Sequence, residues 1–180
     1  MIALLGLLGC AACADAEPVD SAQGTPGTVP CDLCSGLCYE TYEVATEASH
    51  VSGDVSYADE PPTSGNHGSC WAEWGVHAEQ VAAENWVHNL EHGGVVFLYD
   101  CPEDSCPDEK AALASYVESL PVGSALLSPY EPADLPFTVV SWEHRLELGC
   151  FDLPAIQAFY TAHVGRAPEQ STSGPAASCM

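Results

Sequence analysis

The ten cysteines of this chain constrain its fold more than any other residue type. They occur within 180 residues, a density that is unusual in a reducing cytosol, where thiols are few and mostly catalytic or metal-bound. The count therefore indicates an oxidising compartment and a domain cross-linked by disulfides. The length suffices for one domain with a sizeable core, but not for two without such cross-links.

Eight cysteines are the candidates for structural disulfides: Cys31, Cys34, Cys38, Cys70, Cys101, Cys106, Cys150 and Cys179. The spacing predicts one local pair, Cys101 with Cys106, because Pro-Glu-Asp-Ser between them is typical of a tight loop. We expect Cys179 to tie the C-terminal tail to the body of the domain. The Cys31-x-x-Cys34 motif with Cys38 also allows a redox site or a thiolate site for copper(I) or zinc. Because it follows Pro30 rather than a strand, disulfides are favoured.

The first ten residues are typical of an export signal. Residues 2–9 form an apolar run that is far shorter than the roughly 20 residues of a membrane-spanning helix. The run ends at Leu7-Leu8-Gly9-Cys10, which resembles the lipobox of bacterial lipoproteins, so Cys10 is the expected lipidation site. We therefore expect a lipoprotein of the cell envelope, anchored in the membrane by its N-terminal lipid. The alternative is cleavage after Ala14-Asp15-Ala16, which would leave a secreted or periplasmic soluble protein.

Residues 11–30 are small, acidic and rich in Gly and Pro, which is typical of a flexible spacer. Cys13 lies in this spacer and is the odd cysteine, available for a second acylation or an intermolecular bridge. The expected organisation is thus a signal and lipobox segment over 1–10, a spacer over 11–30 and one domain over 31–180.

The charge excludes one large class of partner. Asp and Glu number 26 against 3 Lys and Arg, which gives a formal net charge of −23. A surface of this sign repels the phosphates of nucleic acids and of anionic lipids. We therefore expect no nucleic-acid partner, and no membrane contact apart from the lipid; the sequence identifies no protein partner.

The domain pattern predicts an α+β fold. Residues 95–99 are a β-branched and aromatic run typical of a buried strand. A helix is expected from Pro107 until Pro121 ends it, followed by a short strand over 125–128. A further strand is expected over 137–142, and its alternation of apolar and charged residues continues through Leu148. A last helix is expected after Asp152, its N-cap. This order predicts a largely antiparallel sheet with helices on one side. The N-terminal half, residues 51–94, has the composition of long loops.

Three motifs lie in that loop-rich half: PPTSGNH at 61–67, WAEWG at 71–75 and VHNLEHGGV at 87–95. Together they resemble a bacterial family known as domain of unknown function 3105. The resemblance runs from about His50, which matches a histidine that family members often carry, to Ala167-Pro168-Glu169. The cysteines are not part of the family's general pattern. The resemblance implies membership but no activity, because the family's name assigns none.

The histidines of these motifs predict a transition-metal site. If residues 88–92 are helical, His88 and His92 lie four apart on one face, where both rings can bind one ion. His67 is the natural third ligand, and His50 and Glu91 are auxiliary candidates. A ligand set of this kind suits zinc or copper(II). The only methionines are Met1 and Met180, which excludes a methionine-rich copper carrier.

Two alternatives stay open. The same His, Asn and Glu side chains can form a buried hydrogen-bond network, in which Asn89 and Glu91 bind backbone amides of the Pro-Pro loop. His88-x-x-Glu91-His92 also matches the H-x-x-E-H pattern of zinc proteases, with Glu91 as general base. That five-residue match arises readily by chance, so we assign no catalytic residue and favour a binding protein over an enzyme.

Overall fold

The computed structural model describes residues 38–41, 48–102, 105–169 and 178–179. The signal and lipobox segment with Cys10, the spacer with Cys13, and Cys31 and Cys34 lie outside the described residues. Within the described residues, no helix is both long and apolar enough to cross a bilayer.

The main sheet has six strands in the order β1-β9-β8-β6-β7-β5. Its strands are β1 (Cys38–Thr41), β5 (Gly75–Val76), β6 (Val95–Tyr99), β7 (Ala125–Pro129), β8 (Phe137–Ser141) and β9 (His144–Leu148). The pairings of β1 with β9, β9 with β8 and β8 with β6 are antiparallel, whereas β7 runs parallel to both β6 and β5. The sheet is therefore mixed, with antiparallel pairs at one side, and the α+β class expected from the sequence is confirmed.

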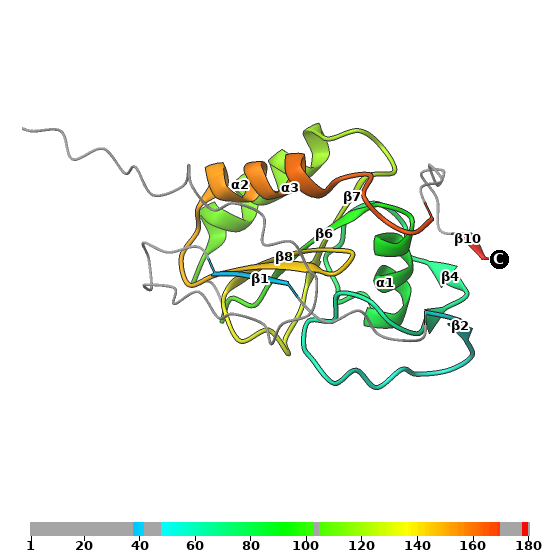
Figure 1. Cartoon of the computed structure of the whole chain (residues 1–180). Helices are drawn as coiled ribbons and strands as arrows, with labels where there is room; N and C mark the ends of the chain where they lie inside the picture. Colours follow the sequence, from blue (N-terminus) through cyan, green and yellow to red (C-terminus); the bar gives the residue numbers. More distant parts are fainter. Residues whose placement is uncertain (1–37, 42–47, 103–104, 170–177, 180) are drawn as a thin grey trace, which may run out of the picture.

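Within the described part of the chain, three helices accompany the sheet: α1 (Ala83–Glu91), α2 (Pro107–Ser119) and α3 (Leu153–His163). Pro107 occupies the first turn of α2, where its missing N–H costs nothing. The carboxylate of Asp152 accepts a hydrogen bond from Ala155 N at 3.1 Å and caps α3, as the sequence predicted. Figure 1 shows α2 and α3 side by side along one face of the sheet.

The core lies on both faces of the sheet. Val95 and Phe97 of β6 point towards the face with α2 and α3, while Val96 and Leu98 pack with Trp86 and other residues of α1. The alternation follows from the two-residue period of a strand, and it explains why β6 is apolar throughout. The expectation of helices on one side holds for α2 and α3 and is wrong for α1, because the buried face of α1 needs an apolar partner of its own.

A turn divides the strand pattern expected from residue 137 through Leu148. Glu143 adopts a positive φ of 65°, and β8 returns as β9 in an antiparallel hairpin. The chain direction therefore reverses within the alternating segment, which periodicity alone does not reveal.

Two small sheets complete the fold beside α1: β2 (His50–Val51) pairs in parallel with β3 (His67–Gly68), and β10 (Ser178–Cys179) pairs with β4 (Cys70–Trp71). A disulfide between Cys70 and Cys179 joins β4 to β10, so the tail is tied to the body as expected. Cys101 and Cys106, the local pair expected from the sequence, also form a disulfide. Cys150 is disulfide-bonded as well.

A candidate metal centre

His67 is held by a buried loop, residues 61–65. The Arg145 guanidinium donates to the Pro61 carbonyl at 2.9 Å, and the Glu143 amide donates to the Thr63 carbonyl at 3.0 Å. These bonds fix the loop against the β8–β9 turn. The loop ends at Gly65, whose carbonyl accepts a hydrogen bond from Nδ1 of His67 at 2.8 Å. His67 is fully buried, and this bond fixes its ring with Nε2 pointing away from the loop.

His50 reaches the same place through the β2–β3 pair. His50 is the direct register partner of His67, and their ring centroids lie 5.0 Å apart. The Ser49 amide donates to the Asn66 side chain, and the His67 amide donates to the Ser49 carbonyl, both at 3.1 Å. The His50 side chain is 36% exposed, so it forms the solvent side of the cluster.

Helix α1 supplies the remaining ligand candidates. The side chain of Asn89 accepts from the Ala72 amide at 2.8 Å and donates to the Ala72 carbonyl at 3.0 Å, which fixes α1 against the segment after β4. Gly93 and Gly94 follow the end of the helix, and their amides bond back to the carbonyls of Leu90 and Asn89. A Cβ on Gly94 would lie 2.2 Å from the Trp74 ring, so only glycine fits there.

The tautomer of His88 follows from its acceptor. Its Nδ1 lies 2.9 Å from the Gly68 carbonyl, which can only accept, so Nδ1 carries the proton. Burial, together with the neighbouring His67, His92 and His50 rings, lowers the pKa of His88 to about 4. The ring is therefore neutral at pH 7, and its Nε2 offers a lone pair.

His92 lies directly after α1, one turn beyond His88. Its Nε2 is 3.0 Å from Nε2 of His88, and because His88 presents a lone pair there, His92 donates the hydrogen bond. Burial lowers the pKa of His92, although Glu169 and Glu91 act in the opposite direction. The Trp71 ring packs edge-on against both imidazoles, with centroid distances of 5.3 Å to His88 and 5.1 Å to His92.

Four side chains converge: His50, His67, His88 and Glu91. Each offers one ligand atom, and these atoms all lie within 4.8 Å of one another. Oε2 of Glu91 is 2.9 Å from Nε2 of His67 and 3.8 Å from Nε2 of His50. We call this set the histidine–glutamate cluster. It has the size and the donor chemistry of a transition-metal site.

The contact between His67 and Glu91 requires a proton or a metal ion between the two atoms. Nδ1 of His67 is used for the Gly65 carbonyl, so in the neutral ring Nε2 is a lone pair facing a carboxylate oxygen. Within the described residues, His67 Nε2 is a buried atom without a hydrogen-bond partner. Either a proton shared between Nε2 and the carboxylate or a metal ion between the two atoms removes the repulsion. Holding the second ring nitrogen on a carbonyl is the usual way in which proteins orient metal-binding histidines.

The structure changes the roles expected for the candidates. The sequence placed His67, His88 and His92 at the centre and His50 and Glu91 as auxiliaries; in the structure, His50 and Glu91 belong to the four-residue cluster. His92 contacts His88 but belongs to a second group, with Glu91 and Glu169. The network alternative placed Asn89 on the Pro-Pro loop, which is wrong because Asn89 binds Ala72.

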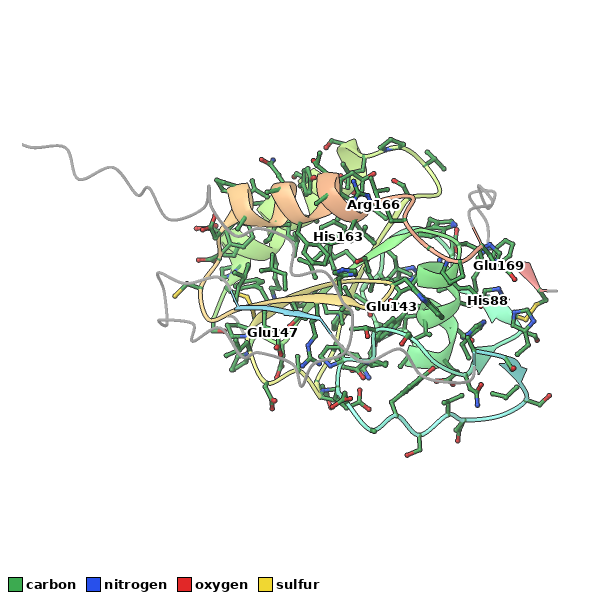
Figure 2. All side chains as sticks on the ribbon, in the orientation of Figure 1. His88, Glu143, Glu147, His163, Arg166 and Glu169 are labelled. Atoms are coloured by element: carbon green, nitrogen blue, oxygen red, sulfur yellow. A yellow bond between two sulfur atoms is a disulfide. The ribbon has the colours of Figure 1, made fainter. Side chains whose placement is uncertain are left out.

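Sequence reasoning missed Glu169. This residue closes the stretch in which the chain resembles its family, which was the available signal. In the structure the Glu169 amide donates to the Glu91 carbonyl at 3.0 Å, so the chain after α3 returns to α1. Figure 2 shows His88 and Glu169 at the same end of the molecule.

The other tryptophans and histidines lie elsewhere. Trp74, Trp86 and Trp142 belong to the core on the α1 face, as expected of most such residues. The rings of His144 in β9 and His163 in α3 contact each other at a tilt of 36°, with centroids 4.4 Å apart.

Comparisons with known proteins bear on the family alone. The model of the family described as "Protein of unknown function (DUF3105)" matches residues 50–176. Neither the curated proteins nor the solved structures gave a match. The matched range holds all five candidate ligands and Glu169, and it covers well over half of the 180 residues. The chain therefore belongs to the DUF3105 family.

Proposed function

We propose that this protein binds a transition-metal ion, zinc or copper(II), through His50, His67, His88 and Glu91. The observation that carries the proposal is the buried Nε2 of His67, which faces the Glu91 carboxylate at 2.9 Å while Nδ1 is held by the Gly65 carbonyl. An ion between these atoms would satisfy both. Three imidazoles and one carboxylate form a ligand set that zinc and copper(II) both accept.

The spacing of the ligand atoms supports this proposal. Ligand atoms held ~2.0–2.1 Å from a tetrahedral zinc ion lie roughly 3.3 Å from one another. The contacts of Glu91 with His67 and His50, at 2.9 and 3.8 Å, fall on either side of that value. Small side-chain movements would therefore be enough to bind an ion. The exposed edge of His50 gives the ion a route from solvent.

The rest of the chain fits the capture of a cation outside the cytoplasm. We propose an exported lipoprotein, anchored through Cys10, that holds its metal site at the cell envelope; the lipobox-like Leu7-Leu8-Gly9-Cys10 and the disulfides support this. The net charge of −23 would raise the local concentration of cations around the protein.

Binding is favoured over zinc-dependent hydrolysis. In the H-x-x-E-H pattern the glutamate acts as general base beside the metal and is not itself a ligand. Here the Glu91 carboxylate lies among the ligand atoms of His50, His67 and His88. Glu91 would therefore be occupied in holding the ion.

Metal content tests the proposal. The full-length chain is produced in an oxidising compartment and compared with His67→Asn and His50→Gln by mass spectrometry. His77→Gln is the matched control, because His77 lies outside the cluster and its side chain makes an exposed hydrogen bond to the Glu73 carbonyl. We expect stoichiometric zinc or copper in the parent and the control, and a loss of affinity of at least about tenfold in both cluster variants.

The His50 variant guards against a folding artefact, because its exposed side chain contributes little to the core. Equal, substoichiometric metal in all four proteins would contradict the proposal. The cluster would then be a hydrogen-bond network in which a proton lies between His67 Nε2 and the Glu91 carboxylate.

A further inference from the structure

A second group of ligand atoms lies beside the histidine–glutamate cluster and shares one residue with it. Glu91, His92 and Glu169 each offer an atom within 4.8 Å of the others. Glu91 and His92 are buried, whereas Glu169 is exposed and closes the group on the solvent side. Two carboxylates and one imidazole suit a divalent ion such as zinc.

The backbone holds this group in place. The Gly165 amide donates to the Gly93 carbonyl at 2.8 Å, and the Glu169 amide donates to the Glu91 carbonyl at 3.0 Å. A Cβ on Gly93 would lie 2.9 Å from the Cα of Gly165, so the two segments touch directly. In Figure 1 the chain after α3 turns back towards α1. Glu169 is therefore fixed next to the end of the helix rather than placed there by a loose tail.

Glu91 is oriented to serve both groups. Its contacts with His67 and His50 are both made by Oε2, so Oε1 is the oxygen available to a second ion. Bridging carboxylates hold paired ions about 3.5–4 Å apart in many two-metal sites. A bridge of this kind would also share the negative charge of a nearly buried carboxylate between two cations.

His92 connects the two positions. It donates a hydrogen bond from Nε2 to the lone pair of His88 Nε2. An ion bound in the histidine–glutamate cluster takes that lone pair, so His92 loses this acceptor when the first ion binds. The ligand atom of His92 already lies within 4.8 Å of those of Glu91 and Glu169.

We propose that Glu91, His92 and Glu169 form a second, weaker metal position, and that Glu91 bridges the two ions. The inference rests on the proposed function, because the second position shares Glu91 with the first. Zinc would bind first to the cluster and then to the second position.

Zinc titration of the metal-stripped full-length chain tests the inference, with bound zinc counted after equilibrium dialysis. We expect two ions per chain in the parent and one in Glu169→Gln, with the tighter affinity unchanged. Glu118→Gln is the matched control for adventitious binding by the acidic surface, because Glu118 is an exposed residue of α2 outside both groups. This control should keep two ions.

Each other result has one meaning. A parent that binds one ion, or a Glu169→Gln variant that still binds two, overturns the second position and leaves the first intact. Equal losses in Glu169→Gln and Glu118→Gln also overturn it, because the weaker ion would then belong to the general acidic surface. A parent that binds no zinc overturns the proposed function and the second position together. Because Glu169 is exposed, its substitution should leave the thermal unfolding of the metal-free protein unchanged.

Discussion

Nε2 of His67 lies 2.9 Å from Oε2 of Glu91, although the two residues come from different elements and His67 already uses its other nitrogen on the Gly65 carbonyl. The loop of residues 61–65 fixes one partner and helix α1 fixes the other. A buried arrangement that brings two electron-rich atoms together is stable only with a proton or a metal ion between them. The loop of residues 61–65 and helix α1 together therefore create a site that could hold a metal ion.

Substituting Gly94 should destabilise the protein through a direct clash. In Gly94→Ala the new Cβ would lie 2.2 Å from the Trp74 ring and 2.8 Å from the Asn89 carbonyl. We expect a loss of about 2–3 kcal/mol in the free energy of unfolding, typical of overpacking. Urea denaturation measures it. Gly53→Ala is the control, since its Cβ meets nothing within 4 Å and costs only the strain of a positive φ, about 1 kcal/mol. Equal losses would contradict the account.

The two described disulfides should differ in their effects. Cys70–Cys179 closes a loop with a sequence separation of 109, against 5 for Cys101–Cys106. A disulfide that closes a longer loop restricts the unfolded chain more. Replacing the first pair with Ser should therefore lower the free energy of unfolding by about 4–5 kcal/mol, and replacing the second pair should lower it clearly less. Cys70 also precedes Trp71, which packs on His88 and His92, so only the first replacement should weaken zinc binding. Thermal unfolding and zinc titration check both points; similar losses of affinity in the two variants would count against a role for Trp71.

Stability should fall in mild acid because of His163. Burial, with His144 and Arg166 nearby, lowers the pKa of His163 from 6.5 to about 4. Between pH 4 and 6.5 the unfolded chain binds more protons at His163 than the folded chain does. The contribution of neutral His163 to the free energy of unfolding is therefore complete above pH 6.5 and is lost as the pH falls towards 4. This shift in the pKa of His163 corresponds to a change of at most about 3 kcal/mol in the free energy of unfolding.

Urea midpoints of the metal-free protein at pH 7 and pH 4.5 measure this effect. His163→Gln should lose less stability between the two pH values than the parent does. If both proteins have the same pH dependence, His163 does not contribute to it.

Membrane attachment should depend on Cys10 alone. If the lipobox-like segment is acylated, Cys10→Ala removes the only expected anchor, and the protein should move from the membrane fraction to the soluble fraction of its host. Cys13→Ala serves as the control, because Cys13 lies three residues further on in the spacer. Retention of Cys10→Ala in membranes would show that another part of the protein attaches it.

Local patterns were enough to predict the elements with strong periodicity. The run at β6 and the Pro107 start of α2 were predicted because β-branched residues and helix-start signals act within a few residues. The pairing of His50 with His67 could not be predicted, because β2 and β3 have two residues each and show no period. Their alignment depends on long-range contacts such as the Ser49–Asn66 bond.

The candidate site was predicted in composition but not in arrangement. Helical spacing correctly placed His88 and His92 one turn apart. The helix ends at Glu91, however, and the ligand atom of His92 groups with Glu91 and Glu169, whereas that of His88 groups with His50, His67 and Glu91. Glu169 is brought to the site by the return of the chain after α3, which no local pattern encodes.

X-ray absorption spectroscopy of the zinc-loaded full-length protein tests the central claim most directly, because it reports the atoms bound to the ion. The account predicts nitrogen and oxygen ligands at ~2.0–2.1 Å, with the outer-shell scattering of several imidazoles that is lost in His67→Asn. Sulfur ligands at ~2.3 Å would place the ion on cysteines instead. A spectrum of hydrated zinc without imidazole would show that the histidine–glutamate cluster holds a proton rather than a metal.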